Sequence, residues 1–448
     1  MENPEITRRA MIAAAGAAGL GALNAEAQDA PKAGDTTKAA TVPEPRSPIN
    51  MNRDKVIFEV DASKPMAEQK VPGHNRWHPD IPAIVEVKPG DEFYVECQEW
   101  TDNQIHNNDS AEDVKNVDLD LIHMLSGPFR IKGAEPGDLL VVDVLEMGPS
   151  RSWGYTGIFA KHNGGSFLVD EFPDAHKAIW DFHGAYATSR HIPGVRFAGM
   201  MHPGQIGTAP SHDLLARWNK REGDLIATDP HRVPPLAMPP KPLNALLGTS
   251  KGAARDRIAR EAARTVPPRE NGGNMDIKNQ TKGSRIFFPV YVDGANLSVG
   301  DLHFSQGDGE ITFCGAIEMA GWIQLGVDLI KGGMAKYGLT APFVRQSPIE
   351  PHYSDHLLFS GISVNTKTDK QHYLDMNLAY KNACLNAIQY LTKVMNYTPA
   401  QAYLLLGAIP MEGRIGGIVD IPNANCTVAI PTGIFDRDIL PGPLVGKA

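Results

Sequence analysis

Cysteine is scarce in this 448-residue sequence, and its pattern excludes two classes of protein. The four cysteines are too few and too scattered for a disulfide framework in a chain of this length. No Cys-x-x-Cys pair occurs, which excludes a cysteine-based zinc ribbon. We therefore expect small, buried hydrophobic roles for Cys97, Cys314, Cys384 and Cys426.

Positive charge is not in excess either. Lysine and arginine number 43 against 52 acidic residues, which gives a net charge of −9, and the basic residues form no stripe. This composition argues against nucleic acid as a partner and favours a small or neutral substrate. Motifs of other enzyme classes are also missing. We find no Gly-x-Ser-x-Gly elbow, Walker loop or dinucleotide fingerprint, and no amidase-signature or nitrilase pattern.

The composition that is present is that of a globular protein rich in turns. Hydrophobic residues make up 42% and charged residues 21%, which excludes a disordered chain or a fibrous rod. The 43 glycines and 35 prolines indicate many tight turns and a strand-heavy fold. The length allows two or three ordinary domains, or one elaborated domain.

The first 27 residues have the three parts of a twin-arginine signal peptide in order. Arg8-Arg9 precedes a weakly apolar stretch of alanine and glycine, and Ala25-Glu26-Ala27 is a small-x-small cleavage site. The stretch is too short and too rich in alanine and glycine for stable insertion into a membrane. The sequence therefore predicts export, for example to the periplasm, and a disordered linker over residues 28–50.

Short strands joined by Pro-Gly-Asp turns follow the linker. Residues 84–97 and 133–144 each place such a turn before a strand, and residues 297–304 contain a weaker copy with Gly300-Asp301 as the turn. Proline presets the first dihedral angle of the turn, glycine takes the positive one and aspartate bonds back to the backbone. The pattern predicts a mixed α/β, β-rich fold of antiparallel sheets in a sandwich-like or barrel-like arrangement.

The C-terminal part contains the clearest helices. Residues 374–395 have amphipathic spacing, and Thr398 is expected to cap a second helix that has Pro399 at its first position. We expect an N-terminal β-rich domain with an irregular insert over residues 51–270. A C-terminal β/α portion over residues 271–448 is expected to carry the functional loop.

The densest group of polar residues lies between positions 271 and 310. Alternate residues of a strand share a face, so Asp301 and His303 are expected to project to one side. The glycines around Asp308 allow a turn that would fold Glu310 back toward them, and Asp276 is expected to approach from a neighbouring loop. An imidazole with several carboxylates suits a divalent ion such as zinc, manganese or calcium. Such an ion would acidify a bound water for attack on a carbonyl group.

A carboxylate that holds no metal would serve as general base and later protonate the leaving amine, and Glu310 and Glu318 are the candidates. His123 and His202 are further catalytic candidates because both are expected at strand ends, where sites gather. Structural alternatives stay open: His123 and His202 as turn residues, Asp301 as a turn residue, His303 as a core histidine and Asp308 as a hairpin tip.

Four segments together resemble the acetamidase/formamidase family. They are residues 123–128, Gly-Ala-Glu-Pro-Gly-Asp at 133–138, Gly-Gly-Asn-Met-Asp at 272–276 and Gly-Asp-Leu-His-Phe-Ser-Gln-Gly-Asp-Gly-Glu at 300–310. The similarity extends from about residue 55 to about residue 436, and residues 201–204 and 274–279 are more similar to the formamidase branch. The resemblance implies hydrolysis of formamide or acetamide to ammonia and a carboxylate, by a homo-oligomer (a dimer or higher).

The resemblance also implies a divalent metal at the Asp and His positions of these motifs. We carry this role onto Asp276 and His303, and further onto Asp301, Asp308 and Glu310. Zinc is the expected ion, with calcium and manganese as alternatives. Two other functions stay open: an exported metal-dependent binding protein, and an amidohydrolase that acts on a larger amide or a cyclic imide.

Overall fold

The computed structural model describes residues 51–230 and 241–442 of the chain. The predicted signal peptide and linker lie outside these residues. All described residues belong to one compact unit. Within them no helix combines the length and the apolar composition needed to cross a bilayer.

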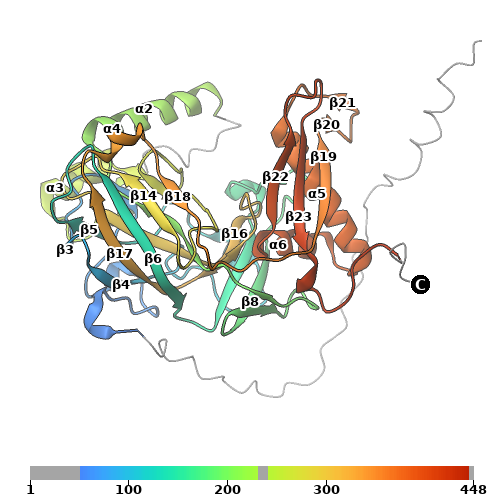
Figure 1. Cartoon of the computed structure of the whole chain (residues 1–448), viewed down its shortest axis with the longest axis horizontal. Coiled ribbons are helices and arrows are strands. Elements are labelled where there is room, and N and C mark those ends of the chain that lie inside the picture. The colour runs from blue at the N-terminus through green and yellow to red at the C-terminus, as the bar shows by residue number, and fades with distance from the viewer. Residues whose placement is uncertain (1–50, 231–240, 443–448) are drawn as a thin grey trace, which may run out of the picture. The chain divides into compact units, whose positions relative to one another are not determined.

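Two large sheets organise the described chain (Figure 1). The six-stranded sheet has the order β1 (Val56–Phe58), β4 (Glu92–Cys97), β17 (Gly321–Ile330), β6 (Leu139–Pro149), β14 (Arg285–Pro289) and β18 (Phe343–Arg345). The ten-stranded sheet has the order β10 (Phe197–Ala198), β9 (Tyr186–Ser189), β8 (His176–His183), β7 (Trp153–Ile158), β16 (Phe313–Met319), β15 (Leu297–Gln306), β11 (His202–Gly207) and β13 (Gly272–Asn274), with β5 (Leu125–Ile131) beside β15 and β3 (Val85–Val87) beside β5.

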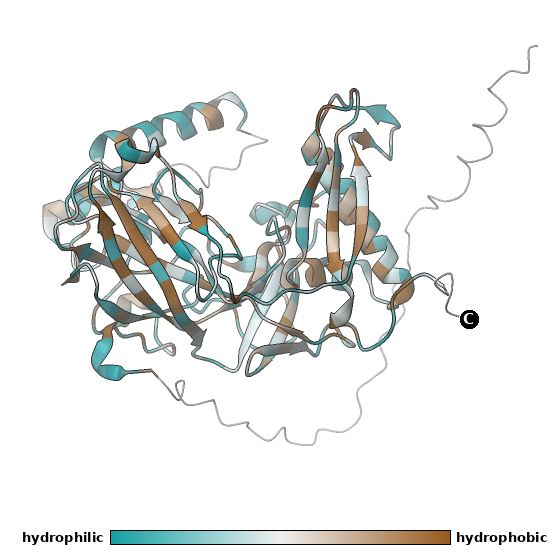
Figure 2. Cartoon of the chain, in the orientation of Figure 1, coloured by the Kyte–Doolittle hydropathy of each residue, from teal (hydrophilic) through white to brown (hydrophobic). Residues whose placement is uncertain are grey.

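Both large sheets stay open, and their pairs are antiparallel apart from β1–β4 and β3–β5. The predicted mixed, strand-rich class is therefore confirmed. Each large sheet contains strands from both before and after residue 270, and the described residues on both sides of the expected boundary belong to one compact unit. One hydrophobic core cluster takes residues from both sheets. Figure 2 shows the strands of the six-stranded sheet as mostly hydrophobic.

A smaller sheet near the C-terminus packs against helices. It consists of β19 (His356–Ile362), β23 (Asn425–Pro431) and β22 (Glu412–Gly417), and α5 (Met376–Val394) packs on β19 and β23. Next, α6 (Pro399–Ala408) contacts strands β7, β8, β15 and β16 of the ten-stranded sheet. The two predicted C-terminal helices are thus confirmed, and α6 joins the smaller sheet to the larger one.

The remaining elements are short or peripheral. Two-stranded ladders pair β2 (Arg76–Trp77) with β12 (Ala263–Arg264) and β20 (Val364–Asn365) with β21 (Lys370–Gln371). The other helices are α1 (Glu112–Asn116), α2 (His212–Thr228), α3 (Gly252–Glu261) and α4 (Gly333–Tyr337). Single 3₁₀ turns span Arg53–Lys55, Met66–Glu68, Lys161–Asn163, Pro242–Asn244 and Thr432–Ile434.

Local sequence signals explain the turns and helix starts. Gly90 and Gly137 have φ values of +89° and +98°, as the Pro-Gly-Asp turns require. In each turn the aspartate accepts a hydrogen bond from the backbone three residues earlier, at 2.8 Å for Asp91 and 2.9 Å for Asp138. At the start of α6, Thr398 forms the predicted cap and, with Gln401, a complete capping box.

The third predicted turn, at Gly300-Asp301, is wrong. Residues 297–306 form the single strand β15, and all ten are buried. The strand pairs with β11 and β16, and with β5 over its first half, so its backbone groups are held in ladders where a turn would release them. Asp301 keeps a turn-like φ of +54° inside the strand.

Candidate functional site

The register of three adjacent strands assembles the centre of the candidate site. His303 of β15 lies opposite His202 of β11 on one side and Glu318 of β16 on the other. Cross-strand partners of this kind have side chains within contact distance. Three residues far apart in the sequence thereby form one row, and Asp301 joins it from the same strand.

His303 lies at the centre of a fully buried network. Its Nε2 is 3.3 Å from Asp301 Oδ1 and 3.1 Å from Glu318 Oε2. Its Nδ1 is 3.0 Å from Gln306 Oε1 and 3.2 Å from His202 Nε2. The Gln306 amide in turn donates to the Asp276 carbonyl oxygen at 2.8 Å. Nε2 therefore faces carboxylates, and Nδ1 faces an amide and a second imidazole.

Asp276 approaches Asp301 and His303 from the loop after β13. The backbone N–H groups of Met275 and Asp276 donate to Gly204 O at 3.1 and 3.3 Å, which holds the loop on strand β11. Asp276, Asp301 and His303 each offer one ligand atom, and these atoms lie within 4.8 Å of one another. Because Asp276 Oδ1 is buried without a hydrogen-bond partner among the described residues, this atom is available to a ligand.

Glu310 reaches the same group from the turn after β15, as the sequence predicted. Its carboxyl group lies near enough to that of Asp276 for each to affect the pKa of the other, and its Oε1 accepts from Gly315 N at 3.4 Å. Together with Asp301 and Glu318, it lines a cavity of about 160 Å³. The expected convergence of Asp276, His303 and Glu310 on one place is thus present in the fold.

Burial and mutual repulsion perturb the titration of these groups. Burial raises the pKa of Asp276 to about 7 and that of Glu318 to about 8. Burial, with the neighbouring Asp276 charge next, raises the pKa of Glu310 well above its usual range. Burial alone would lower the pKa of His303, but the Glu318 and Asp301 carboxylates hold it well above its ordinary value. Such strongly shifted pKa values in a cavity are typical of functional sites.

The rest of the cavity wall is mostly aromatic and apolar. Beside the three carboxylates it is lined by Trp100, His123, Phe167, Val266, Asn274 and Phe313. Pockets for drug-sized ligands start at about 300 Å³, so this cavity suits a molecule of only a few non-hydrogen atoms. Apolar walls beside a few charged groups lower the local dielectric and strengthen the electrostatic interactions of a bound ligand.

The two further histidines occupy different places. His123 lines the cavity, and both its backbone N and its Nδ1 contact Thr265 Oγ1, at 2.6 and 3.1 Å. Burial lowers its pKa to about 4. His202 lies behind His303, with Nδ1 2.7 Å from Met200 O and with its pKa lowered by burial and by His303 to about 3. Both imidazoles are therefore neutral near pH 7, and among the two only His123 lines the cavity.

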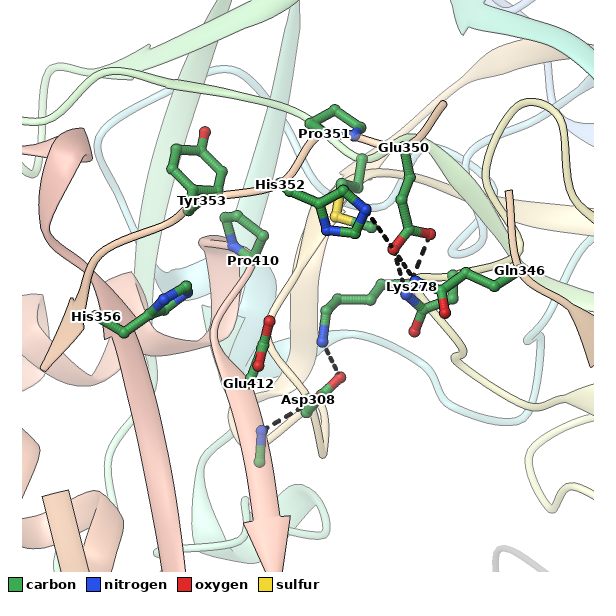
Figure 3. Close-up of a pocket in the computed structure, with 13 residues that line it drawn as sticks. Lys278, Asp308, Gln346, Glu350, Pro351, His352, Tyr353, His356, Pro410 and Glu412 are labelled. Atoms are coloured by element: carbon green, nitrogen blue, oxygen red, sulfur yellow. Dashed lines mark hydrogen bonds and ion pairs between the residues drawn. The ribbon is translucent and has the colours of Figure 1, made fainter. Parts of the chain in front are cut away.

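Asp308, an expected metal ligand, lies outside this group and lines a separate cavity, which is drawn in Figure 3. Its carboxylate forms an ion pair with the buried Lys278 and accepts from Gly413 N at 2.9 Å. It lines a second cavity, of about 180 Å³, together with the buried carboxylate of Glu350. The glycines on either side let the chain turn, and this turn directs Asp308 to one side and Glu310 to the other.

Three residues around the site escaped the sequence analysis as candidates. Gln306 and Asn274 lie inside the quoted motifs, where their amide side chains were a usable signal. Trp100 follows β4 and lies outside every quoted motif, far in sequence from those at 272–276 and 300–310, and only the packing of β4, β5 and β15 brings it to the cavity.

Comparison with known proteins identifies the family of this chain. The model of the Acetamidase/Formamidase family matches residues 59–437. The chain belongs to this family. Two curated relatives in it are a formamidase from Methylophilus methylotrophus, 61% identical over 86% of this chain and 95% of the relative, and an acetamidase from Mycolicibacterium smegmatis, 63% identical over 80% and 91%. Among solved structures, the γ-lactamase from Delftia acidovorans is 59% identical, has a TM-score of 0.84 and covers 86% of this chain and 95% of its own.

Proposed function

We propose that this chain hydrolyses a short aliphatic amide, formamide or acetamide, to ammonia and the carboxylate. The observation that carries this proposal is the cluster of Asp276, Asp301, His303, Glu310 and Glu318 beside a cavity of about 160 Å³. The names of the two curated relatives, formamidase and acetamidase, support the same activity. The family and the site chemistry thus favour an amidohydrolase over a protein that only binds.

We further propose a divalent metal, zinc, held by Asp276, Asp301 and His303. Two carboxylates and an imidazole fit zinc, with calcium and manganese as alternatives. Asp276 Oδ1, which has no hydrogen-bond partner among the described residues, is available as a ligand atom for the metal. When bound, the ion would acidify a water and polarise the substrate carbonyl. Gln306 accepts from His303 Nδ1–H at 3.0 Å, which leaves Nε2 as the ligating nitrogen.

Glu310 is the group that moves the proton in this proposal. Its carboxylate accepts a proton from the attacking water as the oxygen adds to the carbonyl carbon. The same proton then passes to the amide nitrogen as the C–N bond breaks, so that ammonia leaves and the carboxylic acid product remains. Glu318 Oε2 lies 3.1 Å from His303 Nε2, the nitrogen assigned to the metal, so in this proposal its carboxylate stands beside the ion while Gln306 orients the imidazole through Nδ1.

Ammonia release from the purified protein tests the function. We expect turnover of formamide or acetamide in the wild type and a loss of at least about 100-fold in kcat for Glu310→Gln. Glu350→Gln, which removes a buried carboxylate in the second cavity, is the matched control and should keep activity. A wild-type protein that hydrolyses neither amide would contradict the proposal, and so would an unimpaired Glu310→Gln enzyme.

Elemental analysis tests the metal. The wild type should carry close to one divalent ion per chain, and His303→Ala should lose it, whereas the exposed His162→Ala should not. Calorimetric titration of zinc into protein that has been stripped of metal by a chelator gives a second readout, and this readout does not depend on activity. Equal metal content in wild type and His303→Ala would overturn this ligand set.

A cyclic amide is a second candidate substrate. The γ-lactamase relative, 59% identical to this chain, favours this alternative, which the sequence analysis left open as a larger or cyclic substrate. A panel of formamide, acetamide, butyramide and a γ-lactam, compared by kcat/KM, separates the two. The small cavity leads us to expect the highest values for the shortest acyl groups.

Export through the twin-arginine route to the periplasm remains a proposal that rests on residues 1–27 of the sequence. Cell fractionation of the wild type and of the double variant Arg8→Lys, Arg9→Lys tests it. Retention of the variant, but not of the wild type, in the cytoplasm is the expected result.

We also propose a homo-oligomer. Large apolar side chains are exposed on β19, on β22 and on the loop that follows it: Leu358 (53%), Ile362 (45%), Ile415 (62%), Val419 (75%) and Ile421 (67%). Exposed apolar residues gathered in this way are typical of protein interfaces. Sedimentation should give at least a dimer, and Ile415→Glu combined with Val419→Glu should shift it toward the monomer.

A further inference from the structure

Two side chains in the wall of the 160 Å³ cavity each have a buried polar atom without a partner among the described residues. One is the indole Nε1 of Trp100, a side chain that is 3% exposed. The other is Asn274 Oδ1, whose amide nitrogen donates to Val266 O at 3.1 Å. Nε1 can only donate and Oδ1 can only accept. Because a buried polar atom without a partner is costly, such a pair of atoms indicates a ligand with one acceptor and one donor.

A carboxamide has this pair of groups on a single planar unit. Its carbonyl oxygen accepts hydrogen bonds, and its nitrogen donates them. An ester of the same acyl group has the carbonyl oxygen but no N–H. A site that offers both this donor and this acceptor would favour an amide over an ester, and neither atom belongs to the carboxylate and imidazole cluster.

We propose that Trp100 Nε1–H donates to the carbonyl oxygen of the substrate and that Asn274 Oδ1 accepts from its amide N–H. This inference rests on the proposed amide hydrolysis and adds how the site selects a small carboxamide. The acyl group faces the apolar wall formed by Phe167, Val266 and Phe313. Trp100 thereby supplies a preformed hydrogen bond to the oxygen on which negative charge develops.

The position of Trp100 is well defined by its neighbours. Its ring lies 5.0 Å from the ring of His123 and 6.2 Å from that of Phe159, and its backbone oxygen accepts from Met124 N at 3.2 Å. Asn274 is held by its pairing with Gln205 in the β11–β13 ladder. Both groups are thus preorganised, which keeps the cost of binding a small ligand low.

The first test removes the indole N–H but keeps an aromatic ring. Trp100→Phe should lower kcat/KM for acetamide by about 100-fold, as loss of a single oxyanion donor does. It should also raise the inhibition constant of methyl acetate against acetamide hydrolysis, since the ester has the same carbonyl oxygen. Trp322→Phe is the matched control, because Trp322 also has a buried Nε1 without a partner among the described residues but lies on β17 against Tyr94. Its kinetics should be unchanged.

The second test removes the acceptor. Asn274→Leu should raise KM for acetamide by about 10-fold or more, because a hydrogen bond to the substrate is lost. The inhibition constant of methyl acetate, which has no N–H to donate, should stay near the wild-type value. Asn274→Ala, which adds no bulk, should give the same split. Asn219→Leu on α2 is the control, since its Nδ2 also donates to a backbone oxygen, Glu261 O at 2.8 Å, and its Oδ1 also lacks a partner among the described residues.

The outcomes separate this inference from the proposed function. Suppose that the wild-type enzyme hydrolyses acetamide. An unimpaired Trp100→Phe variant would then overturn the inference alone, and so would an Asn274→Ala variant that changes the amide and ester constants equally. A wild-type protein without amide hydrolysis would overturn the proposed function. Thermal unfolding of each variant shows whether it is folded, and the comparison of amide with ester within one variant holds even for a partly destabilised protein.

Discussion

Gly204 is the residue where the site is least tolerant of added atoms. A Cβ built on it would lie 2.6 Å from His303 Cε1 and 2.7 Å from Asp301 Oδ2, closer than real contacts of this kind. Its backbone conformation is one that other residues adopt, so the effect of a substitution there acts through contact with the site. The strand β11 thus uses a glycine to let its neighbours' side chains converge.

We predict that Gly204→Ala lowers kcat/KM for acetamide by about 100-fold or more, because His303 and Asp301 must move by several tenths of an ångström. Metal content measured on the same preparation should fall as well. Gly433→Ala, where a Cβ meets no described atom within 4 Å, should behave as the wild type. Full activity in Gly204→Ala would show that these two side chains do not work in the arrangement seen here.

Asp308 allows a test between a metal ligand and a structural residue. Its partner Lys278 has a side chain that is only 6% exposed, and the other acceptor that Lys278 contacts is Met411 O at 3.2 Å. We predict that Asp308→Asn lowers the free energy of unfolding by about 2 kcal/mol, because the buried ammonium loses its carboxylate. Metal content should not change. Loss of the metal in Asp308→Asn would restore the role that the sequence analysis assigned to this residue.

Helix α6 is the element whose formation depends most visibly on its first residues. Thr398 Oγ1 accepts from Gln401 N at 3.2 Å, and Gln401 Oε1 accepts from Thr398 N at 2.9 Å. We predict that Thr398→Ala costs about 1 kcal/mol of stability in urea unfolding, whereas Thr398→Ser retains most of it. Thr392→Ala near the end of α5, where no cap is removed, should have little effect. If Thr398→Ala lowers the free energy of unfolding by less than about 0.3 kcal/mol, tertiary packing alone holds this helix end.

Elements set by neighbouring residues were predictable, and elements set by distant ones were not. The Thr398 cap and the turns at Gly90 and Gly137 depend on a few consecutive residues, so their sequence signals are complete. The turn expected at Gly300 has the same local signal, yet β15 runs through it because strands on both sides pair with it. Non-local pairing therefore overrides a local turn signal where the segment is buried on both edges.

In the candidate site, likewise, contacts set by local spacing were predictable, whereas contacts set by the pairing of distant strands were not. Asp301 and His303 were expected on one face of a strand from their spacing, and their 3.3 Å contact agrees with this. His202 and Glu318 reach His303 through the register of β11 and β16, and Trp100 reaches the cavity through the packing of β4 and β5. No spacing in a single sequence specifies such contacts, because a shift of one residue would turn every side chain to the other face.

At the scale of the molecule, the C-terminal segment supports the turn that carries Glu310. Gly307 N donates to Gly407 O at 2.7 Å, and Asp308 N donates to Met411 O at 3.0 Å. The end of α6 and the residues that follow it therefore hold the first two residues of the turn between β15 and Glu310. The smaller sheet and its helices thus take part in positioning the site, although none of their residues lines its cavity.

A second long-range connection joins the peripheral helix α2 to the segment just before β13, the strand that leads into the Asp276 loop. We expect this connection to make the free energy of unfolding depend on pH. Glu270, just before β13, accepts hydrogen bonds from Arg221 at 2.6 and 2.9 Å and from Trp218 Nε1 at 2.8 Å. Hydrogen bonding to Arg221 lowers the pKa of Glu270 from 4.5 to about 2. Since the folded pKa lies below the unfolded one, the contribution to stability is present above pH 4.5 and disappears as the pH falls toward 2.

We predict that Glu270→Gln lowers the free energy of unfolding at pH 7 by on the order of 1 kcal/mol, a value reduced by solvent screening of this partly exposed pair. The difference from the wild type should shrink steadily in urea titrations at pH 5, 4 and 3, because the wild-type carboxylate becomes protonated in the unfolded chain first and in the folded chain last. The exposed Glu68→Gln serves as the control for removal of a surface charge. A difference that stays constant from pH 7 to pH 3 would show that α2 is held by packing and not by the charge on Glu270.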